Sequence, residues 1–412
     1  SEQLYHLKHS VLEKSPLSGN DVTAIAADKY LRGWIASNID GISVYNPVTQ
    51  YNEVIDKALA GLKIAKLHID EQYTWVLDEQ GLTKIDIDQL SVIATYTTEN
   101  SELPAGKLVD WLPIDDEHAL ITHREDGISL FSLADLSFTQ FTTNNSSLMT
   151  NQFSQMIKIN NINWISSNVG LHTFDPFTRA FTHFLFTPQQ NITQVNHLTT
   201  NRQGHIVLST NNGMHIFDPL SKQFVLTQFP HKIMMMNIQA TLVSDSGTYW
   251  STLKNGLIEY RDNMDSFAWY TLADGLQGNE FNAGVSYRNS KGNFVFSGLN
   301  GITVLNPNAL SKPPIKLKIA SLKAIFKDGS TQSFYNIHEP KLSFERAVDV
   351  IQIRLGDTSF TSHTNNQFEY VGPEGMTEFD GFSFAFSPEP GNHQIQIINP
   401  SNNTNSSLID PL

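Results

Sequence analysis

The sequence predicts an all-β protein, with a seven-bladed β-propeller followed by an immunoglobulin-like β-sandwich. Three observations predict this fold class. A glycine-centred motif recurs seven times at nearly constant spacing, an apolar residue precedes each of these glycines, and short strand-like runs continue after the repeat stops at Pro314. Repeats of about 40 to 50 residues are typical of propeller blades built from four strands.

The repeat consists of a strand-like run, a polar turn, and then a glycine that opens an alternating segment. The first copy reads Gly33–Asn38 and then Gly41–Pro47. The glycines are separated by 40, 46, 43, 43, 43 and 45 residues, which matches one blade for each copy. We call them the marker glycines: Gly41, Gly81, Gly127, Gly170, Gly213, Gly256 and Gly301.

An apolar residue lies six or seven positions before each marker glycine. Bulky apolar side chains at a fixed place in a repeat are expected where neighbouring repeats pack against each other. We call this position the apolar slot, and it holds Trp34, Trp75, Leu120, Trp164, Val207, Trp250 and Val295.

The N-terminal segment is predicted to close the ring of blades. The seventh copy runs from Asn279 to Pro307 and continues to Lys312 without an outer strand. An incomplete last blade would expose an unpaired sheet edge. Leu4–Lys8 precedes the first copy and can supply the missing strand, so we assign residues 1–311 to the propeller.

The period stops after Pro314, although strand-like runs such as Ile315–Ile319 and Val350–Ile353 continue. Short strands at this spacing favour an immunoglobulin-like sandwich over residues 312–400. The polar run Ser401–Ser407 predicts a linker over residues 401–412.

The composition excludes several classes of partner. A formal net charge of −14 argues against nucleic acid, because phosphate backbones bind basic surfaces. The absence of cysteine excludes disulfides and thiolate metal sites. No run approaches the roughly 20 apolar residues that span a bilayer, so we expect membrane attachment only through segments outside this chain.

The copies follow a recognisable pattern, as in Asn20–Val22 with Tyr45–Pro47, and the most specific stretch runs from Asp274 to Asn282 and on to Gly298–Gly301. The repeats resemble the two-component regulator propeller of bacterial membrane signalling proteins. The specific stretch resembles the segment that ends such propellers before a β-sandwich named after three tyrosines.

That resemblance implies a function. In the family, the sandwich leads into a transmembrane helix and a cytoplasmic histidine kinase or diguanylate cyclase. The chain would then be a non-catalytic, periplasmic ligand-sensing region that forms a homodimer and transmits binding through the sandwich. The alternatives are a secreted propeller enzyme, either a lyase or a hydrolase acting on a polysaccharide or small molecule, and a protein-interaction scaffold.

The sequence supports no catalytic, metal or cofactor assignment. It has no phosphate loop, no His-Glu-x-x-His helix and no Gly-x-Ser-x-Gly elbow. His172 and His215 share one repeat position, where strand residues are favoured over a substrate-binding pair. Asp115 and Asp116 could serve a glycosidase, but a surface turn is the favoured interpretation.

Candidate ligand-binding residues lie in the loops that lead into the innermost strand of each blade, where propellers bind ligands around the central channel. Amide side chains there offer donors and acceptors that suit a neutral small molecule or oligosaccharide. Asparagine at a repeated position is also a common turn residue. The predicted residues are Asn20, Asn151, Gln152, Asn196, Asn237, Gln239, Asn279, Phe281 and Asn282.

Overall fold

The computed structural model describes residues 21–411 apart from 47–48, 50, 56–58, 226–232, 262–266, 275, 309–316, 336–340, 343, 345, 358–366, 373–374, 381–382, 389–394 and 399–405. The chain divides into two compact units. The first comprises Ser1–Asp262 and Tyr270–Leu310, and the second comprises Asn263–Trp269 and Ser311–Leu412.

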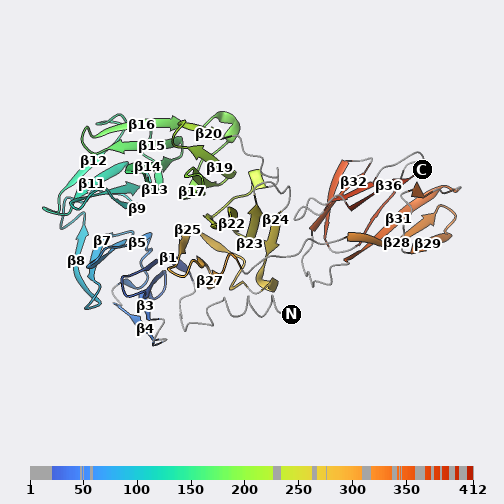
Figure 1. The fold of residues 1–412 in the computed structure, drawn as a ribbon, viewed down its shortest axis with the longest axis horizontal. Coiled ribbons are helices and arrows are strands. Elements are labelled where there is room, and N and C mark those ends of the chain that lie inside the picture. The colour runs from blue at the N-terminus through green and yellow to red at the C-terminus, as the bar shows by residue number, and fades with distance from the viewer. Residues whose placement is uncertain are drawn as a thin grey trace. The chain divides into compact units, whose positions relative to one another are not determined.

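Residues 22–305 form seven consecutive sheets, six of four strands and one of three, which we number as blades 1 to 7 (Figure 1). In every blade the strands follow one another across the sheet in sequence order. Blades 1 to 3 consist of β1 (Val22–Ala27), β2 (Gly33–Ser37), β3 (Gly41–Asn46), β4 (Tyr51–Val54); β5 (Lys66–Ile69), β6 (Tyr73–Leu77), β7 (Gly81–Asp86), β8 (Ser91–Thr97); β9 (Leu108–Pro113), β10 (His118–His123), β11 (Ile128–Ser132) and β12 (Phe138–Phe141).

The remaining blades repeat the same order. They consist of β13 (Phe153–Ile159), β14 (Ile162–Ser167), β15 (Gly170–Asp175), β16 (Ala180–Leu185); β17 (Val195–Thr200), β18 (Ile206–Thr210), β19 (Gly213–Asp218), β20 (Gln223–Val225); β21 (Ala240–Val243), β22 (Thr248–Leu253), β23 (Gly256–Arg261), β24 (Phe267–Tyr270); and β25 (Phe281–Arg288), β26 (Phe294–Gly298) and β27 (Gly301–Leu305).

The innermost strands of neighbouring blades contact each other around a closed circuit. The contacting pairs are β1 with β5, β5 with β9, β9 with β13, β13 with β17, β17 with β21, β21 with β25, and β25 with β1. A closed circuit of radially arranged sheets is the architecture of a β-propeller, so the predicted all-β propeller is confirmed.

Every marker glycine begins the third strand of its blade or directly precedes it. In several blades the outer strand passes so close that no side chain fits. A Cβ on Gly81 would lie 2.1 Å from the Tyr96 carbonyl oxygen, and one on Gly170 would lie 2.3 Å from that of Phe184. The repeat keeps glycine here because only a residue without a Cβ allows this backbone approach.

The apolar slot lies on the second strand of each blade, and none of its seven side chains is more than 4% exposed. The polar edge of a buried indole needs an acceptor, and two blades supply one from the preceding turn. Trp34 Nε1 donates to Asp28 Oδ2 at 2.9 Å, and Trp75 Nε1 donates to Asp70 Oδ2 at 3.3 Å.

Blade 7 has three described strands, and its inner strands lie against blade 1. The Ser297 hydroxyl donates to the Val22 carbonyl at 3.1 Å, which ties the two ends of the repeat together. Residues 1–20, including Leu4–Lys8, lie outside the described part of the chain. Closure of blade 7 by that segment therefore stays a prediction.

The structure describes short 3₁₀ turns, among them η2 (Pro188–Gln190), η3 (Ile233–Met235) and η4 (Leu272–Asp274). Within the described ranges, no helix has both the length and the apolar character needed to cross a membrane.

The second unit contains two sheets. The first has the strand order β29-β28-β31-β34, and the second has the order β30-β36-β35-β32-β33. On β28 and β31 alternate residues such as Leu322 and Ile353 are buried, so one face of the first sheet is covered. An immunoglobulin-like topology stays a prediction. The strands are β28 (Leu317–Phe326), β29 (Thr331–Tyr335), β30 (Lys341–Leu342), β31 (Val348–Asp357), β32 (Gln367–Gly372), β33 (Gly375–Asp380), β34 (Ser383–Phe386), β35 (Ile395–Ile398) and β36 (Ser406–Pro411).

The predicted linker over residues 401–412 is wrong for its second half. Residues 406–411 form β36, which pairs with β35 on one side and β30 on the other. A strand between two neighbours has its backbone N–H and C=O groups satisfied, whatever the polarity of the preceding run. The polar composition of 401–407 could not reveal that pairing.

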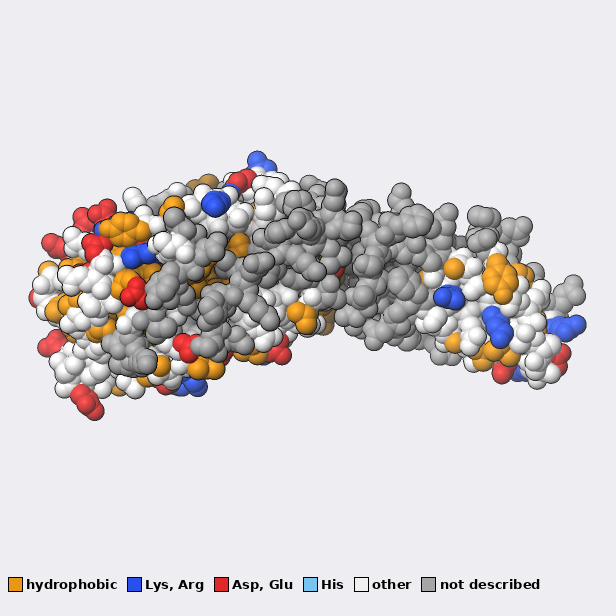
Figure 2. Space-filling view, turned by 90° about the horizontal axis from the view of Figure 1, so that it is seen from below, with side chains coloured by type: hydrophobic (Ala, Val, Ile, Leu, Met, Phe, Trp, Pro, Cys, Tyr) orange, Lys and Arg blue, Asp and Glu red, His pale blue; other side chains and the backbone are white. Residues whose placement is uncertain are grey.

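Acidic side chains are spread over the first unit. On the face seen in Figure 2, Asp and Glu side chains of the described residues are scattered among polar and apolar ones and form no continuous patch. The formal charge of −14 is therefore not gathered into one anionic surface on that face.

We expect Trp34→Ala to destabilise the protein by about 3 to 5 kcal/mol, because it opens a cavity between blades and removes the indole donor from Asp28. Guanidinium unfolding followed by circular dichroism measures the loss. Phe177→Ala is the matched control, since Phe177 is 97% exposed, and it should change stability by about 0.5 kcal/mol or less. Equal losses in both variants would contradict the role given to the apolar slot.

Candidate functional site

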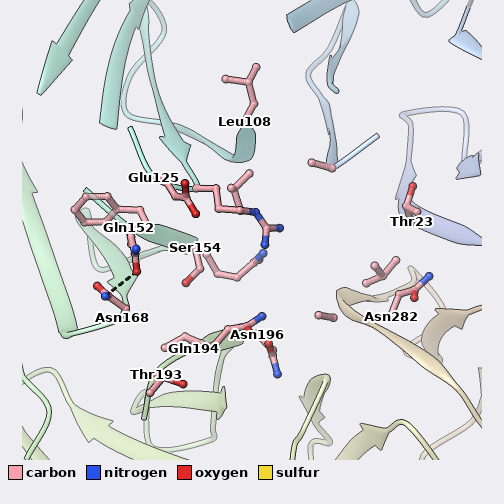
Figure 3. Close-up of a pocket in the computed structure, with 18 of the residues that line it drawn as sticks. Thr23, Leu108, Glu125, Gln152, Ser154, Asn168, Thr193, Gln194, Asn196 and Asn282 are labelled. Atoms are coloured by element: carbon pink, nitrogen blue, oxygen red, sulfur yellow. Dashed lines mark hydrogen bonds between the residues drawn. The ribbon is translucent and has the colours of Figure 1, made fainter. Parts of the chain in front are cut away.

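A cavity of about 410 Å³ lies on one face of the first unit, around the central channel (Figure 3). This volume is within the usual range for sites that hold small ligands. Six of the seven blades contribute, through their innermost strands or through loops and turns on the same face. The lining residues are Thr23, Ile64, Ala65, Leu108, Val109, Arg124, Glu125, Gln152, Phe153, Ser154, Gln155, Asn168, Thr193, Gln194, Val195, Asn196, Asn282, Ala283 and Val285.

Three of the predicted ligand-binding residues line this cavity: Gln152, Asn196 and Asn282. Figure 3 shows Gln152 and Asn168 on one side of the space, with Thr23 and Asn282 on the other. Asn20 lies outside the described residues. The predicted residues that do not line the cavity are Asn151, Asn237, Gln239, Asn279 and Phe281.

Asn196, Asn237 and Gln239 form a hydrogen-bonded cluster between blades 5 and 6. Asn196 Nδ2 donates to Asn237 Oδ1 at 3.0 Å and to the Ile238 carbonyl at 2.8 Å. Gln239 Nε2 donates to the same Asn237 oxygen at 3.0 Å. These amides join two blades, and the donors of Asn196 and Gln239 are already in use.

Asn282 joins blade 7 to blade 1 in the same manner. Its Nδ2 donates to Asp21 Oδ1 at 2.9 Å and to the Val22 carbonyl at 2.8 Å. The repeated amides thus serve mainly to connect innermost strands, which share no continuous hydrogen-bond ladder.

The other predicted residues have local roles. Asn151 Oδ1 accepts from the Thr143 backbone at 2.9 Å, and Asn279 Oδ1 accepts from the Leu272 backbone at 2.6 Å. Both contacts fix loop conformation, as expected for an asparagine in a turn. Phe281 is 6% exposed and packs edge-on against Phe296, so it offers no stacking surface.

Sequence reasoning missed the two charged side chains of the cavity, Arg124 and Glu125. They occupy the turn between β10 and β11, just before Gly127, and both are exposed. The turn is held by Arg124 N, which donates to the Lys107 carbonyl at 2.9 Å. The sequence holds a signal for these two residues. This turn of the repeat is charged in blade 3, whereas the corresponding turn of blade 4 carries the uncharged residues Asn168 and Val169.

A buried carboxylate below the cavity joins blades 2, 3 and 4. Asp110 is fully buried, and its Oδ1 lies 2.7 Å from Lys66 Nζ. Its Oδ2 accepts from the Met156 backbone at 2.7 Å. A buried charge is tolerated when it is paired and hydrogen-bonded in this way. Neither Lys66 nor Asp110 lines the cavity, and their arrangement favours a structural role.

The two histidines that share a repeat position do not form a pair. His172 Nε2 lies 2.7 Å from Ser167 Oγ, and its Nδ1 lies 2.7 Å from His183 Nδ1. His215 Nε2 lies 2.9 Å from the Asn212 carbonyl in the next blade. Each residue bonds within its own blade, and neither lines the cavity, which favours their interpretation as strand residues.

Burial keeps three histidines of the first unit uncharged at neutral pH. Desolvation, together with the neighbouring His183, lowers the pKa of His172 to about 3. Desolvation likewise lowers the pKa of His123 to about 4. The pKa of His197 falls to about 3 because it is desolvated and lies near Lys66. A charged imidazole in these sites would lose the water that stabilises its charge.

The acidic pair Asp115 and Asp116 lies in an exposed turn, as the sequence interpretation favoured. Asp115 Oδ1 accepts from the Glu117 backbone at 2.9 Å, and it lies 3.0 Å from His118 Nδ1. Across the ranges that the structure describes, no three His, Asp or Glu side chains are grouped so that they could hold a metal ion.

No family model matches this chain. No curated protein matches it either. The resemblance to two-component regulator propellers therefore rests on its repeat residues and on the fold.

Solved structures match the fold over nearly the whole chain. One is described as the extracellular domain of a hybrid two-component system, BT3049 of B. thetaiotaomicron. It aligns with a TM-score of 0.68 at 16% identity, covering 97% of this chain and 56% of that chain. The extracellular domain of BT4673, from the same bacterium, aligns with a TM-score of 0.57 at 15% identity, covering 95% and 57%.

A propeller enzyme also matches the fold. A catalytically inactive variant of virginiamycin B lyase from Staphylococcus aureus aligns with a TM-score of 0.54 at 14% identity, covering 71% of this chain and 96% of that chain. At these identities, likeness shows the fold alone. This chain also spans little more than half the length of the two extracellular domains.

The depressed histidine pKa values predict that acid destabilises the protein. His123, His172 and His197 bind protons more readily when unfolded, where the ordinary pKa is 6.5. Stability should therefore fall as the pH drops from above 6.5 toward about 4. At one pH unit below the unfolded value, each residue costs about 1.4 kcal/mol, or about 4 kcal/mol for the three.

Urea unfolding at several pH values tests this dependence. His172→Phe should reduce the loss on acidification by about 1.4 kcal/mol, whatever its effect at neutral pH. Phe177→Ala provides the control, because it changes an exposed side chain that does not titrate and should leave the slope unchanged. If the slope were the same in all three proteins, His172 would not be neutral in the folded state.

Proposed function

We propose that this chain is the extracytoplasmic ligand-sensing region of a membrane-anchored signalling protein, and that the cavity around its channel binds a small ligand. The cavity carries the proposal, since six blades converge on one concave site with polar side chains and a volume of about 410 Å³. Likeness to an extracellular two-component domain over 97% of the chain supports the sensing role.

The finer assignments follow from the repeat resemblance. The parent protein would carry a histidine kinase or diguanylate cyclase, with this region in the periplasm. Ligand binding would be transmitted through the C-terminal unit of a homodimer. The ligand would be a small molecule or an oligosaccharide, and the chain itself would be non-catalytic. Sedimentation of the purified chain with and without ligand would test the dimer.

The enzyme alternative has a specific requirement. A lyase or hydrolase needs a general acid or base within reach of its substrate. Among the described residues that line the cavity, the ionisable side chains are Arg124 and Glu125, and no histidine is present. Both side chains are exposed, whereas groups tuned for acid–base catalysis are commonly desolvated. This arrangement favours binding over catalysis.

Reading the gene beyond the codon for Leu412 tests the sensor assignment. We expect a stretch of about 20 apolar residues, followed by a cytoplasmic kinase or cyclase domain. A stop codon at that point would contradict membrane anchoring on the C-terminal side and favour a secreted protein.

Filling the cavity tests the binding site. Thr193 lines it, is exposed, and contributes only its backbone to the hydrogen bonds of the turn. Thr193→Trp should preserve the melting temperature but weaken binding of any ligand found in a metabolite screen at least tenfold. Thr178→Trp, on an exposed turn outside the lining set, is the control. Unchanged affinity in Thr193→Trp would place the ligand elsewhere.

A further inference from the structure

Several polar side chains around the cavity are already engaged within the protein. The Asn196 and Asn282 donors connect blades. Gln152 Oε1 accepts from Asn168 Nδ2 at 2.8 Å, which Figure 3 shows as a dashed line. The Ser154 hydroxyl lies 2.8 Å from that of Ser166. A neutral ligand that depended on the Asn196 or Asn282 donors would have to break contacts that join neighbouring blades.

Besides the Thr193 hydroxyl, four polar side chains remain available in the cavity: Arg124, Glu125, Gln155 and Gln194. Across the part of the chain that the structure describes, no hydrogen bond or ion pair engages their side-chain atoms. Two of the four are ionic, and they are the ionisable groups of the described lining. The free chemistry of the cavity is therefore one guanidinium, one carboxylate, two primary amides and one hydroxyl.

Arg124 and Glu125 present opposite charges from one fixed turn. His123 N donates to the Gly127 carbonyl at 3.0 Å, so the turn closes tightly around them. Within the described residues the two side chains do not pair with each other. A free guanidinium binds a carboxylate through two parallel hydrogen bonds, and a free carboxylate accepts the hydrogens of an ammonium group. A ligand that carries both charges would satisfy both side chains.

The two free glutamines suit a peptide group. A primary amide has a donor and an acceptor on adjacent atoms, which matches the C=O and N–H of a peptide. Gln155 reaches across the channel to blade 7, because a Cβ on Gly284 would lie 3.1 Å from Gln155 Nε2. Gly284 has a φ of +74°, a conformation that favours glycine, so the backbone leaves room for this amide.

The apolar part of the cavity does not suit a sugar ring. Phe153 is the aromatic residue of the described lining, but it is only 4% exposed and its ring lies against His172. No flat face is free to cover the apolar side of a pyranose. The exposed apolar surface comes instead from Ala65 and Ala283, which suits small aliphatic side chains.

We infer that the ligand of this cavity is a short peptide with free termini and small aliphatic side chains. Its carboxylate pairs with Arg124, its ammonium group pairs with Glu125, and its peptide groups contact Gln155 and Gln194. This inference rests on the proposed binding function and narrows it, since an oligosaccharide was the ligand class that the repeated amides first suggested.

Calorimetric titration of the full chain with tri-alanine tests the inference. Three further arms use tri-alanine amide, N-acetyl tri-alanine, and a mixture of neutral and uronic oligosaccharides. We expect tri-alanine to bind, and blocking either terminus to weaken binding at least tenfold. Arg124→Gln should weaken tri-alanine binding at least tenfold and leave the affinity for tri-alanine amide unchanged. Glu125→Gln should also weaken tri-alanine binding at least tenfold, and it should leave the affinity for N-acetyl tri-alanine unchanged.

Lys107→Gln is the matched control, because it removes an exposed cation beside the same turn without altering the described lining. It should leave tri-alanine binding unchanged. Saccharide binding that Thr193→Trp abolishes and Arg124→Gln does not would overturn the peptide inference while sustaining the proposed sensor. Failure of tri-alanine to bind would also overturn it. Peptide binding unaffected by both Arg124→Gln and Thr193→Trp would overturn the inference and the proposed site together.

Discussion

The propeller depends on the joint between its last and first blades. Asn282 and Ser297 of blade 7 donate to the Val22 carbonyl of blade 1, across 260 and 275 positions of sequence. Beside these bonds, Val22 packs with Ile35 of its own blade and Val295 of blade 7. Every other blade contacts a sequence neighbour on each side. Only this joint connects segments separated by all seven repeats, so its contacts must offset the entropy that is lost when so long a loop closes.

The same solution recurs at other joints around the channel. Innermost strands of different blades lie side by side without a continuous ladder, so side chains must satisfy their backbone groups. Asp110 does this between blades 3 and 4, and Asn196 does it between blades 5 and 6. These hydrogen bonds restrain the inner strands, and a preorganised cavity loses less entropy when it binds a ligand.

This use of the inner-strand side chains changes how the cavity should be interpreted. Polar residues near a channel are readily taken for ligand contacts. Here the polar side chains of the inner strands first satisfy the backbone groups at the joints between blades. What remains for a ligand is set by side chains outside the joints, chiefly Arg124 and Glu125 on a turn. The separation of structural amides from free ionic groups gives the cavity both a fixed shape and a definite charge pattern.

The sequence by itself determined the architecture of the first unit. Marker glycines and apolar slots are local requirements of each blade, such as the close approach at Gly81 or the burial of Trp34, so their spacing is written into the chain. Three residues that the sequence singled out, Gln152, Asn196 and Asn282, line the cavity. The sequence could not assign their hydrogen bonds, since each partner lies in another loop or blade.

Only the tertiary structure decided which groups are free. Asn237 and Asn282 look alike in the repeat, but one accepts within a cluster and the other closes the ring. The strand β36 was equally hidden, because its pairing with β30 and β35 depends on segments distant in sequence. Periodic packing is encoded residue by residue, whereas the availability of a polar atom depends on every neighbour that folding brings within hydrogen-bond reach.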